Sequence, residues 1–211
     1  MSPKEFIQNT YYFLIRSTLK AWMRVLFKLD MCGLENLNLK TNFILAGNHT
    51  GFLDALVIIS SVNRPVRFLV SEEILNWPFI GLLLRIFGEI SVKSGNGMKA
   101  IEEATQALLN GGIVCIFPEG KLTVDGSIGK FKKGVVVLQK ESHLPVIPFA
   151  IDGGFEAWGW QSSLKLRKIS VKFGSPITFD AKLEDDECIN QFRERVLCLK
   201  KELEEKKGTN Y

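Results

Sequence analysis

The sequence predicts an α/β fold, with a mixed, largely parallel central sheet flanked by helices and preceded by an N-terminal amphipathic helix. After residue 30, short apolar runs alternate with longer stretches of helical periodicity. Strands separated by helices favour parallel pairing. The length of 211 residues and the hydrophobic content of 46% suit one domain with a short appendage. We expect residues 1–30 to form the helix and residues 31–211 the domain.

The first element, residues 11–29, predicts a helix that lies in a membrane interface. Its cations recur every fourth residue and should form one narrow stripe on an aromatic-rich body. They are Arg16, Lys20, Arg24 and Lys28. No acidic residue lies between Glu5 and Asp30, which favours the membrane surface. The alternative is an ordinary helix packed on the domain with a basic outer face.

The domain that follows should contain six strands and five helices. Strands are predicted at 42–47, 66–71, 88–92, 112–117, 145–151 and 169–174. Helices are predicted at 53–62, 72–87, 97–110 and 130–141, and a charged amphipathic helix at 183–207. The helix at 97–110 has the clearest ends, because Asn96 can cap its start and Gly111 can end it in a left-handed conformation.

The charge and the cysteines exclude some classes of protein. A net charge of +4 is compatible with anionic lipids or phosphorylated substrates. The lysines neither interleave with aromatic residues on a sheet nor gather on one helix, so nucleic-acid binding is not expected. The four cysteines show no CxxC motif and no metal-ligand spacing with histidine, which favours reduced thiols in a cytosolic protein and no metal site.

The stretch "ILAGNHTGFLDAL" places His49 just after a predicted strand and Asp54 in the first turn of the next helix. Strand ends are where chemistry collects in open α/β sheets. Asp54 could hold the imidazole by one ring nitrogen and leave the other free as a general base. Without a GxSxG motif, the base would act on a hydroxyl of the substrate. Alternatively, the pair arises by chance from composition.

The stretch "CIFPEGKLTVDGSIGKFKKG" ends a buried strand with Glu119 and Gly120 at its carboxyl edge. The glycine allows close approach of a ligand. The glycines and lysines that follow, among them Lys121 and Lys132, do not form a P-loop but suit a flexible phosphate-binding loop. The competing interpretation is a solvated turn with scattered lysines.

The stretch "WPFIGLLLRIFGEISVKSG", residues 77–95, is apolar until it reaches Lys93. A helix and strand of the core explain most of this pattern. The more specific interpretation is a wall for a long apolar chain of a ligand, with Lys93 near its polar end.

These stretches together resemble the glycerolipid acyltransferases, in particular the lysophosphatidic acid acyltransferase (1-acyl-sn-glycerol-3-phosphate acyltransferase) family. The first motif of that family, Asn-His-x4-Asp, is matched by Asn48, His49 and Asp54. The later motifs are matched, in order, by residues 88–93, by Phe-Pro-Glu-Gly at 117–120 with Phe-Lys-Lys-Gly at 131–134, and by Pro-Val-Ile-Pro at 145–148. The resemblance covers residues 42–150.

The resemblance implies transfer of an acyl chain from acyl-CoA or acyl carrier protein to the hydroxyl of a lysophospholipid in phospholipid synthesis. It implies that His49 removes the hydroxyl proton and that Asp54 orients it. Glu119 and Gly120 would help to hold the acceptor's glycerol, and cations would hold its phosphate. We expect substrate contacts at Asn48, Lys93, Glu119, Gly120, Lys121 and Lys132. No metal and no bound cofactor are implied.

Two departures from the family concern the cations that bind the acceptor phosphate. Ser71 stands where the family commonly has lysine, and Leu122 stands where it commonly has arginine. Lys93, Lys121 or Lys132 could substitute. The acceptor is therefore either 1-acylglycerol-3-phosphate or a different lyso-lipid. Two rival functions are a non-catalytic lipid-binding relative and a thioesterase-like hydrolase that uses water as acceptor.

The expected location is cytoplasmic, with the protein bound peripherally or monotopically to the inner face of the membrane. No run of 18 uncharged apolar residues is present, and the first apolar region lacks a signal-peptide cleavage site.

Overall fold

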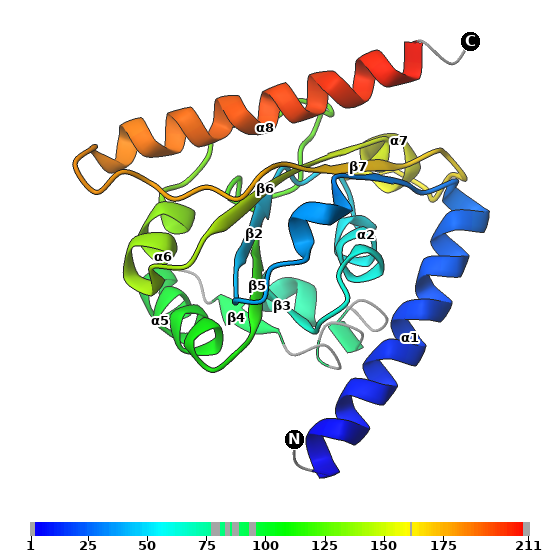
Figure 1. The fold of residues 1–211 in the computed structure, drawn as a ribbon. Helices are drawn as coiled ribbons and strands as arrows, with labels where there is room; N and C mark the ends of the chain where they lie inside the picture. Colours follow the sequence, from blue (N-terminus) through cyan, green and yellow to red (C-terminus); the bar gives the residue numbers. More distant parts are fainter. Residues whose placement is uncertain are drawn as a thin grey trace.

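The computed structural model describes residues 3–76, 81–82, 85, 89–92, 96–160 and 162–208. Within these residues, seven strands form one central sheet in the order β1-β7-β6-β2-β5-β3-β4 (Figure 1). The strands are β1 Asp30–Cys32, β2 Ile44–Gly47, β3 Val66–Ser71, β4 Ile90–Val92, β5 Ile113–Ile116, β6 Val146–Asp152 and β7 Ser170–Phe173. The pair β6–β7 is antiparallel and the other pairs are parallel. The sheet is therefore mixed and largely parallel, as predicted.

The central strands are buried on both faces. Every residue of β2, β5 and β6 is buried, which matches their nearly continuous apolar sequences. β3, nearer the edge of the sheet, alternates between buried and more exposed positions. The predicted strands agree with the observed ones to within a few residues.

Helices cover the two faces of the sheet and form two hydrophobic cores with it. The helices are α1 Pro3–Phe27, α2 Asp54–Ser61, α3 Glu72–Leu75, α5 Gly97–Leu109, α6 Gly134–Ser142, α7 Gly154–Trp158 and α8 Asp185–Gly208, with a 3-10 turn, η1, at Leu34–Leu37. Residues of α1 and α2 belong to one core, and residues of α5, α6 and α8 belong to the other. Figure 1 shows α5 and α6 on one side of the sheet and α1 and α2 on the other, with α8 running across the top next to β6 and β7.

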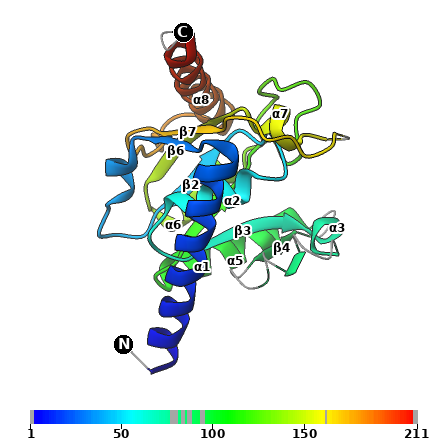
Figure 2. The same ribbon diagram turned by 90° about the vertical axis from the view of Figure 1, so that its right-hand side faces the viewer.

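Helix α1 packs one side against α2 and leaves another side exposed. Tyr12, Met23 and Phe27 are buried in the shared core. The exposed side carries Phe13, Leu14, Trp22, Val25 and Leu26. Figure 2 shows the N-terminal turns extending beyond the sheet. None of the helices in the described ranges combines the length and the apolar character needed to cross a bilayer.

The basic stripe of α1 drifts around the helix. Arg16 is buried, Lys20 is partly buried and Arg24 is exposed. Lys28, the fourth cation of the predicted stripe, lies beyond the end of α1 at Phe27 and has a left-handed φ of 46°, so the helix ends two residues before the predicted position 29. Partial burial, followed by the charges of Arg16 and Arg24, lowers the pKa of the Lys20 ammonium. The stripe thus runs from the packed side of α1 to its exposed side, because residues four apart advance by more than one turn.

Some elements differ from the sequence prediction. The edge strand β1 was not predicted because "DMC" has no apolar run and gains its structure from pairing with β7. The short helix α7 was also missed, since five residues carry too little periodicity. Of the helix predicted at 72–87, the structure assigns α3, and residues 77–80, 83–84 and 86–88 lie outside the described residues, as does Lys93.

Candidate active site

The site begins where β2 and β5 end. These strands are parallel neighbours, with Ala46 opposite Ile116, so the segments that follow them meet at one edge of the sheet. The segment after β2 carries His49, and the segment after β5 carries Phe117 and Glu119. The imidazole of His49 stacks on the ring of Phe117, with centroids 4.0 Å apart and planes 13° apart.

The side chains of His49 and Asp54 meet as the sequence predicts. Nδ1 of His49 lies 2.9 Å from Oδ2 of Asp54. Because a carboxylate accepts, Nδ1 carries the proton, and Nε2 on the far side of the ring has the free lone pair. The side chain of His49 is 24% exposed, whereas Asp54 is fully buried. The ring is thus fixed from within and accessible from outside.

The buried carboxylate of Asp54 is stabilised by several further donors. Its Oδ2 also accepts hydrogen bonds from the backbone N–H groups of Thr50, at 2.5 Å, and Gly51, at 2.9 Å. Its Oδ1 accepts one from the hydroxyl of Thr50 at 2.8 Å. A buried charge needs such partners. They keep the carboxylate in place to orient His49.

The backbone of His49 is held by the loop that follows β5. Its N–H donates to Oε1 of Glu119 at 2.8 Å, and its carbonyl accepts from the N–H of Thr123 at 3.0 Å. The other oxygen of Glu119 accepts from the N–H of Gly129 at 2.9 Å. We call residues 48–53, between β2 and α2, the histidine loop. Glu119 therefore joins the histidine loop to the loop over residues 120–131.

Asn48 anchors the same loop to the neighbouring strand β6. Its side-chain amide donates to the carbonyl of Ile151 and accepts from the N–H of Ile151, both at 2.8 Å. Asn48 and Glu119 are buried, and neither lines the cavity beside His49. Contact of these two side chains with substrate stays a prediction. In the structure, they position His49.

A cavity of about 820 Å³ opens beside His49. Most of its wall is apolar. Lining residues include Phe52, Ala55, Phe68, Leu69, Ile74, Val92, Ile101, Ile116 and Val137. A volume of this size accommodates a large ligand with a long apolar part. The cavity brings such a ligand next to the imidazole.

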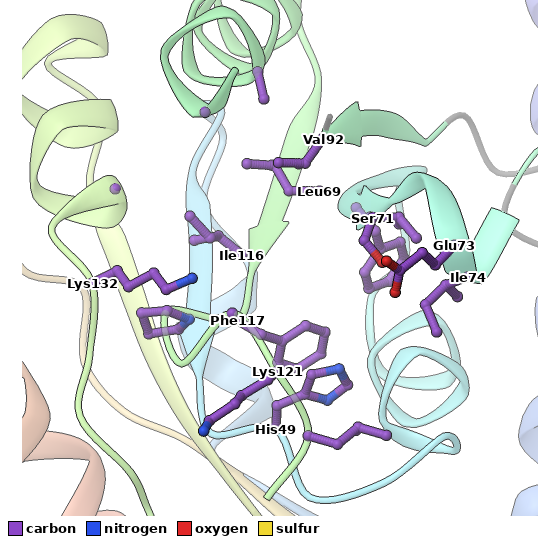
Figure 3. Close-up of a pocket in the computed structure, with 18 of the residues that line it drawn as sticks. His49, Leu69, Ser71, Glu73, Ile74, Val92, Ile116, Phe117, Lys121 and Lys132 are labelled. Atoms are coloured by element: carbon purple, nitrogen blue, oxygen red, sulfur yellow. The ribbon is translucent and has the colours of Figure 1, made fainter. Parts of the chain in front are cut away.

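Two of the predicted cationic residues, Lys121 and Lys132, line this cavity. Figure 3 shows Lys132 pointing into it from one side, with Ser71 and Glu73 on the other. Lys93 lies outside the described residues, so its predicted contact is untested. The structure therefore combines an apolar wall, a histidine and two lysines.

Gly120 lies at the turn where the loop after β5 passes the cavity. Its φ of 67° is in the left-handed region that favours glycine, and its N–H closes the turn on the carbonyl of Phe117 at 3.0 Å. A Cβ there would come within 2.6 Å of Nζ of Lys132. Gly120 thus lines the cavity next to a cation, and its contact with substrate stays a prediction.

The packing of α7 under the histidine loop was not predicted from the sequence. A Cβ on Gly154 would lie 2.2 Å from Oγ1 of Thr50 and 2.9 Å from Oδ1 of Asp54. The N–H of Phe52 also donates to the carbonyl of Trp158 at 3.1 Å. The available signal was the glycine pair in "DGGFEAWGW", which ends a buried strand just before an aromatic cluster.

Cys115 precedes the site on β5 and is completely buried. Burial, followed by the charge of Asp54, raises the pKa of its thiol well above the usual value. A buried neutral thiol is a poor nucleophile, so Cys115 is not a candidate for covalent catalysis. Among the described residues, no three histidine, cysteine, aspartate or glutamate side chains are placed to hold a metal ion.

A model of the Acyltransferase family matches residues 28–152. The chain belongs to the acyltransferase family. The match contains the segments from β2 to the end of β6 that carry His49, Asp54 and Glu119, whereas α7 and Trp160 lie just beyond it. The resemblance expected from four short motifs is therefore confirmed, and the mixed α/β sheet is the fold of an acyltransferase.

Curated members of the family are named 1-acyl-sn-glycerol-3-phosphate acyltransferase. One from Cocos nucifera is 29% identical over 165 residues, which cover 75% of this chain and 53% of that protein. One from Borreliella burgdorferi is 30% identical over 127 residues, which cover 59% of this chain and 51% of that protein. The chain spans about half the length of these curated relatives.

A solved structure of the family extends the likeness to almost the whole chain. The 1-acyl-sn-glycerophosphate acyltransferase from Thermotoga maritima is 25% identical, with a TM-score of 0.81, and the match covers 98% of this chain and 84% of that one. The acyltransferase fold described here therefore includes helices α1 and α8 at the two ends.

The two departures from the acyltransferase motifs both fall on the cavity. Ser71 and Leu122 line it, although the motifs commonly have cations at these positions. Lys121 and Lys132 line it as well. The positive charge of this acyltransferase site thus comes from different residues, and the carboxylate of Glu73 lies on the same wall as Ser71 (Figure 3).

Proposed function

We propose that this protein transfers a fatty acyl chain from an acyl thioester to the free hydroxyl of a lysophospholipid in phospholipid synthesis. The observation that carries the proposal is the hydrogen bond of 2.9 Å between His49 and Asp54 at the wall of an apolar cavity. Family membership and the names of the curated relatives support the same reaction.

In the proposed reaction, His49 is the general base. Its Nε2 accepts the proton of the acceptor hydroxyl while the hydroxyl oxygen attacks the thioester carbonyl carbon. Asp54 keeps the proton of the ring on Nδ1 and stabilises the imidazolium that forms. The carbon–sulfur bond then breaks, and the imidazolium returns its proton to the departing thiolate.

The acceptor's phosphate is proposed to bind Lys121 and Lys132. Both line the cavity that contains His49, and a lysine ammonium binds phosphate as a point charge. Since Ser71 and Leu122 replace the cations common in the family, the acceptor is 1-acylglycerol-3-phosphate held by these lysines or a lyso-lipid with another headgroup.

The acyl chain is proposed to lie against the apolar wall formed by β3, β5 and α5. Phe68, Ile101 and Ile116 represent these three elements in the lining. Buried methylene groups contribute about 0.8 kcal/mol each, so a wall of this kind selects long chains. The donor is acyl-CoA or acyl carrier protein, and both belong in the assay.

We propose that the reaction takes place at a membrane surface, to which the protein is attached through α1. The exposed apolar side chains of α1, its exposed Arg24 and the exposed Lys28 just after its end support this proposal. Substrates with one acyl chain partition into membranes, so an enzyme at the surface meets them where they are concentrated.

A single assay tests the reaction and the acceptor. Purified protein is incubated with acyl-CoA or acylated carrier protein and a panel of lyso-lipids, and acylated product and free thiol are both measured. Strong preference for lysophosphatidate would discard the alternative of another headgroup. Full release of thiol without any lyso-lipid would indicate a hydrolase, and absence of both products would indicate a non-catalytic relative.

A further inference from the structure

A second exposed apolar and basic surface lies at the rim of the active site, away from α1 in the sequence. We call residues 160–168 the rim segment; residue 161 is not among those described. Leu164 is 53% exposed and Leu166 is 65% exposed. Lys165, Arg167 and Lys168 alternate with them and are exposed too.

The rim segment reaches the active-site cavity at its start. Trp160 lines the cavity and is also partly exposed. Its ring lies 6.3 Å from that of Phe52, which lines the same cavity. In Figure 2, the arrow of β3 points toward the side where α3, α7 and the chain after α7 lie.

The backbone of the rim segment is fixed in place. The N–H of Lys165 donates to the carbonyl of Ala157 in α7 at 2.7 Å. Just beyond the segment, the N–H of Ile169 donates to the carbonyl of Phe27 at 2.9 Å, and the carbonyl of Ile169 accepts from Asp30. The segment therefore runs from the cavity to the end of α1, and Figure 2 shows this return.

We propose that the rim segment is a second membrane-docking surface, which inserts Leu164 and Leu166 between lipid headgroups while Lys165 and Arg167 bind anionic lipid. The charge pattern supports this occupant, because residues 160–168 contain three cations and no acid. Lys168 pairs with Asp30 at 3.8 Å, so the charge offered to lipid comes from Lys165 and Arg167. The hydrogen bond from Ile169 to Phe27, which brings the end of the segment to the end of α1, supports it further. Two separated contacts would orient the cavity toward the lipid.

The main alternative occupant is an acidic donor protein, which would also be attracted by these cations. The exposed leucines favour the bilayer, since apolar side chains that alternate with cations are typical of interfacial insertion. A carrier protein would need the charges more than the leucines. The two occupants can therefore be separated by substituting each kind of residue.

The test measures flotation of the purified full chain with vesicles of phosphatidylcholine, alone or mixed with phosphatidylglycerol. Lys165→Ser with Arg167→Ser should lower binding to the anionic vesicles by about tenfold or more, because each cation near the surface contributes about a factor of five. Leu164→Ser with Leu166→Ser should lower binding to both kinds of vesicle, by about tenfold for the pair.

The matched control is Leu109→Ser with Lys99→Ser, an exposed leucine and an exposed lysine on α5. This pair should leave binding unchanged. Melting temperatures of all variants should match that of the original chain, since every substituted side chain is exposed. A loss of binding by the rim variants alone, with their folds intact, supports the proposal.

Insertion is tested directly with an environment-sensitive fluorophore. It is attached at Leu164→Cys in a chain that carries Cys32→Ser and Cys198→Ser, the two cysteines that are not buried. Emission should shift to the blue on addition of anionic vesicles, whereas the same probe at Leu109→Cys should not respond. Absence of a shift at position 164 overturns the proposal.

Two outcomes separate this inference from the proposed function. His49→Ala should bind vesicles as tightly as the original chain, so binding stands even if no acyl transfer is found. Rim variants that bind vesicles normally but lose transfer only from acylated carrier protein would assign the surface to that protein and overturn membrane docking.

Discussion

His49 is fixed at three places: its ring on Asp54, its N–H on Glu119 and its carbonyl on the N–H of Thr123. Only the ring contact was expected from the sequence. The other two depend on residues about seventy positions away, which fold back because β2 and β5 are neighbours. The position of the candidate base therefore depends on the backbone arrangement of two loops as well as on the side chains of His49 and Asp54.

Replacement of the base should abolish most of the activity and little of the stability. We expect His49→Ala to lower kcat by about 10²–10⁴, because no base then removes the proton of the lyso-lipid hydroxyl. Steady-state rates with acyl thioester and lyso-lipid measure this. His143→Gly, which removes the other histidine, is the control and should keep full activity; equal losses in both variants would contradict the role of His49.

Gly154 should be sensitive to a single added methyl group. In Gly154→Ala, the Cβ would collide with Thr50 and press on Asp54, at a cost of about 1–3 kcal/mol in the free energy of unfolding. Activity should also fall, since the collision displaces the partners of His49. Urea unfolding and initial rates measure the two effects.

Gly97→Ala is the matched control for Gly154→Ala. A Cβ at this first residue of α5 meets nothing within 4 Å, and alanine is the better helix former. Its free energy of unfolding should stay the same or rise. If both alanine variants lose stability equally, the close packing of α7 under the histidine loop is not what matters.

Glu119 should matter through the position of His49. Glu119→Gln keeps the size of the side chain but turns an amide donor toward one of two backbone N–H groups, those of His49 and Gly129. An unsatisfied buried donor costs about 1–3 kcal/mol, so stability should fall and kcat should fall with it. Thermal unfolding and initial rates check this; an increase in KM alone would indicate direct contact with substrate instead.

At the scale of elements, α6 ends at a strained residue. His143 has a φ of 55°, in the left-handed region, and its N–H caps the helix on the carbonyl of Gln139 at 2.8 Å. We expect His143→Gly to stabilise the fold by about 0.5 kcal/mol, because glycine enters this conformation without a Cβ penalty. Urea unfolding measures it, and a loss of stability would show that the imidazole has a structural partner.

Helix α1 illustrates the difference between a predicted element and its packing. Its existence and its basic stripe follow from residues 11–29, but Arg16 lies inward while Trp22 and Val25 lie outward. Which side of a mostly apolar helix faces the domain depends on the shape of the neighbouring α2, which the sequence pattern does not contain.

At the scale of the whole molecule, α1 is part of the core. Deletion of residues 1–28 would remove Met23 and Phe27, whose burial contributes about 2–5 kcal/mol each, a large part of a typical total. We expect the truncated chain to melt at a much lower temperature or to aggregate. Equal melting temperatures would show that α1 is an independent appendage.

Membrane attachment through α1 is therefore better tested with point variants. Trp22→Ser with Val25→Ser changes two exposed side chains, so stability should be unaffected while flotation with vesicles decreases. Leu109→Ser is the control on another helix. Unchanged flotation would contradict attachment through this side of α1.

The sequence predicted the central sheet well because its buried strands are short, apolar and separated by periodic helices. It also predicted that His49 and Asp54 meet at the end of β2, and it singled out Gly120, Lys121 and Lys132, which line the cavity. It did not predict that Asn48 and Glu119 bind backbone groups. The sequence does not show whether a polar side chain near an active site faces the substrate or the protein. β1 and α7 were missed because tertiary pairing, rather than local pattern, defines them.

The carboxylate of Glu119 makes the histidine loop and the loop over residues 120–131 a single mechanical piece. Such a site is ready before any ligand arrives. A stable mimic of the tetrahedral adduct should then inhibit as soon as it is mixed with the protein, with no slow onset. Removal of the two hydrogen bonds of Glu119 should introduce a lag.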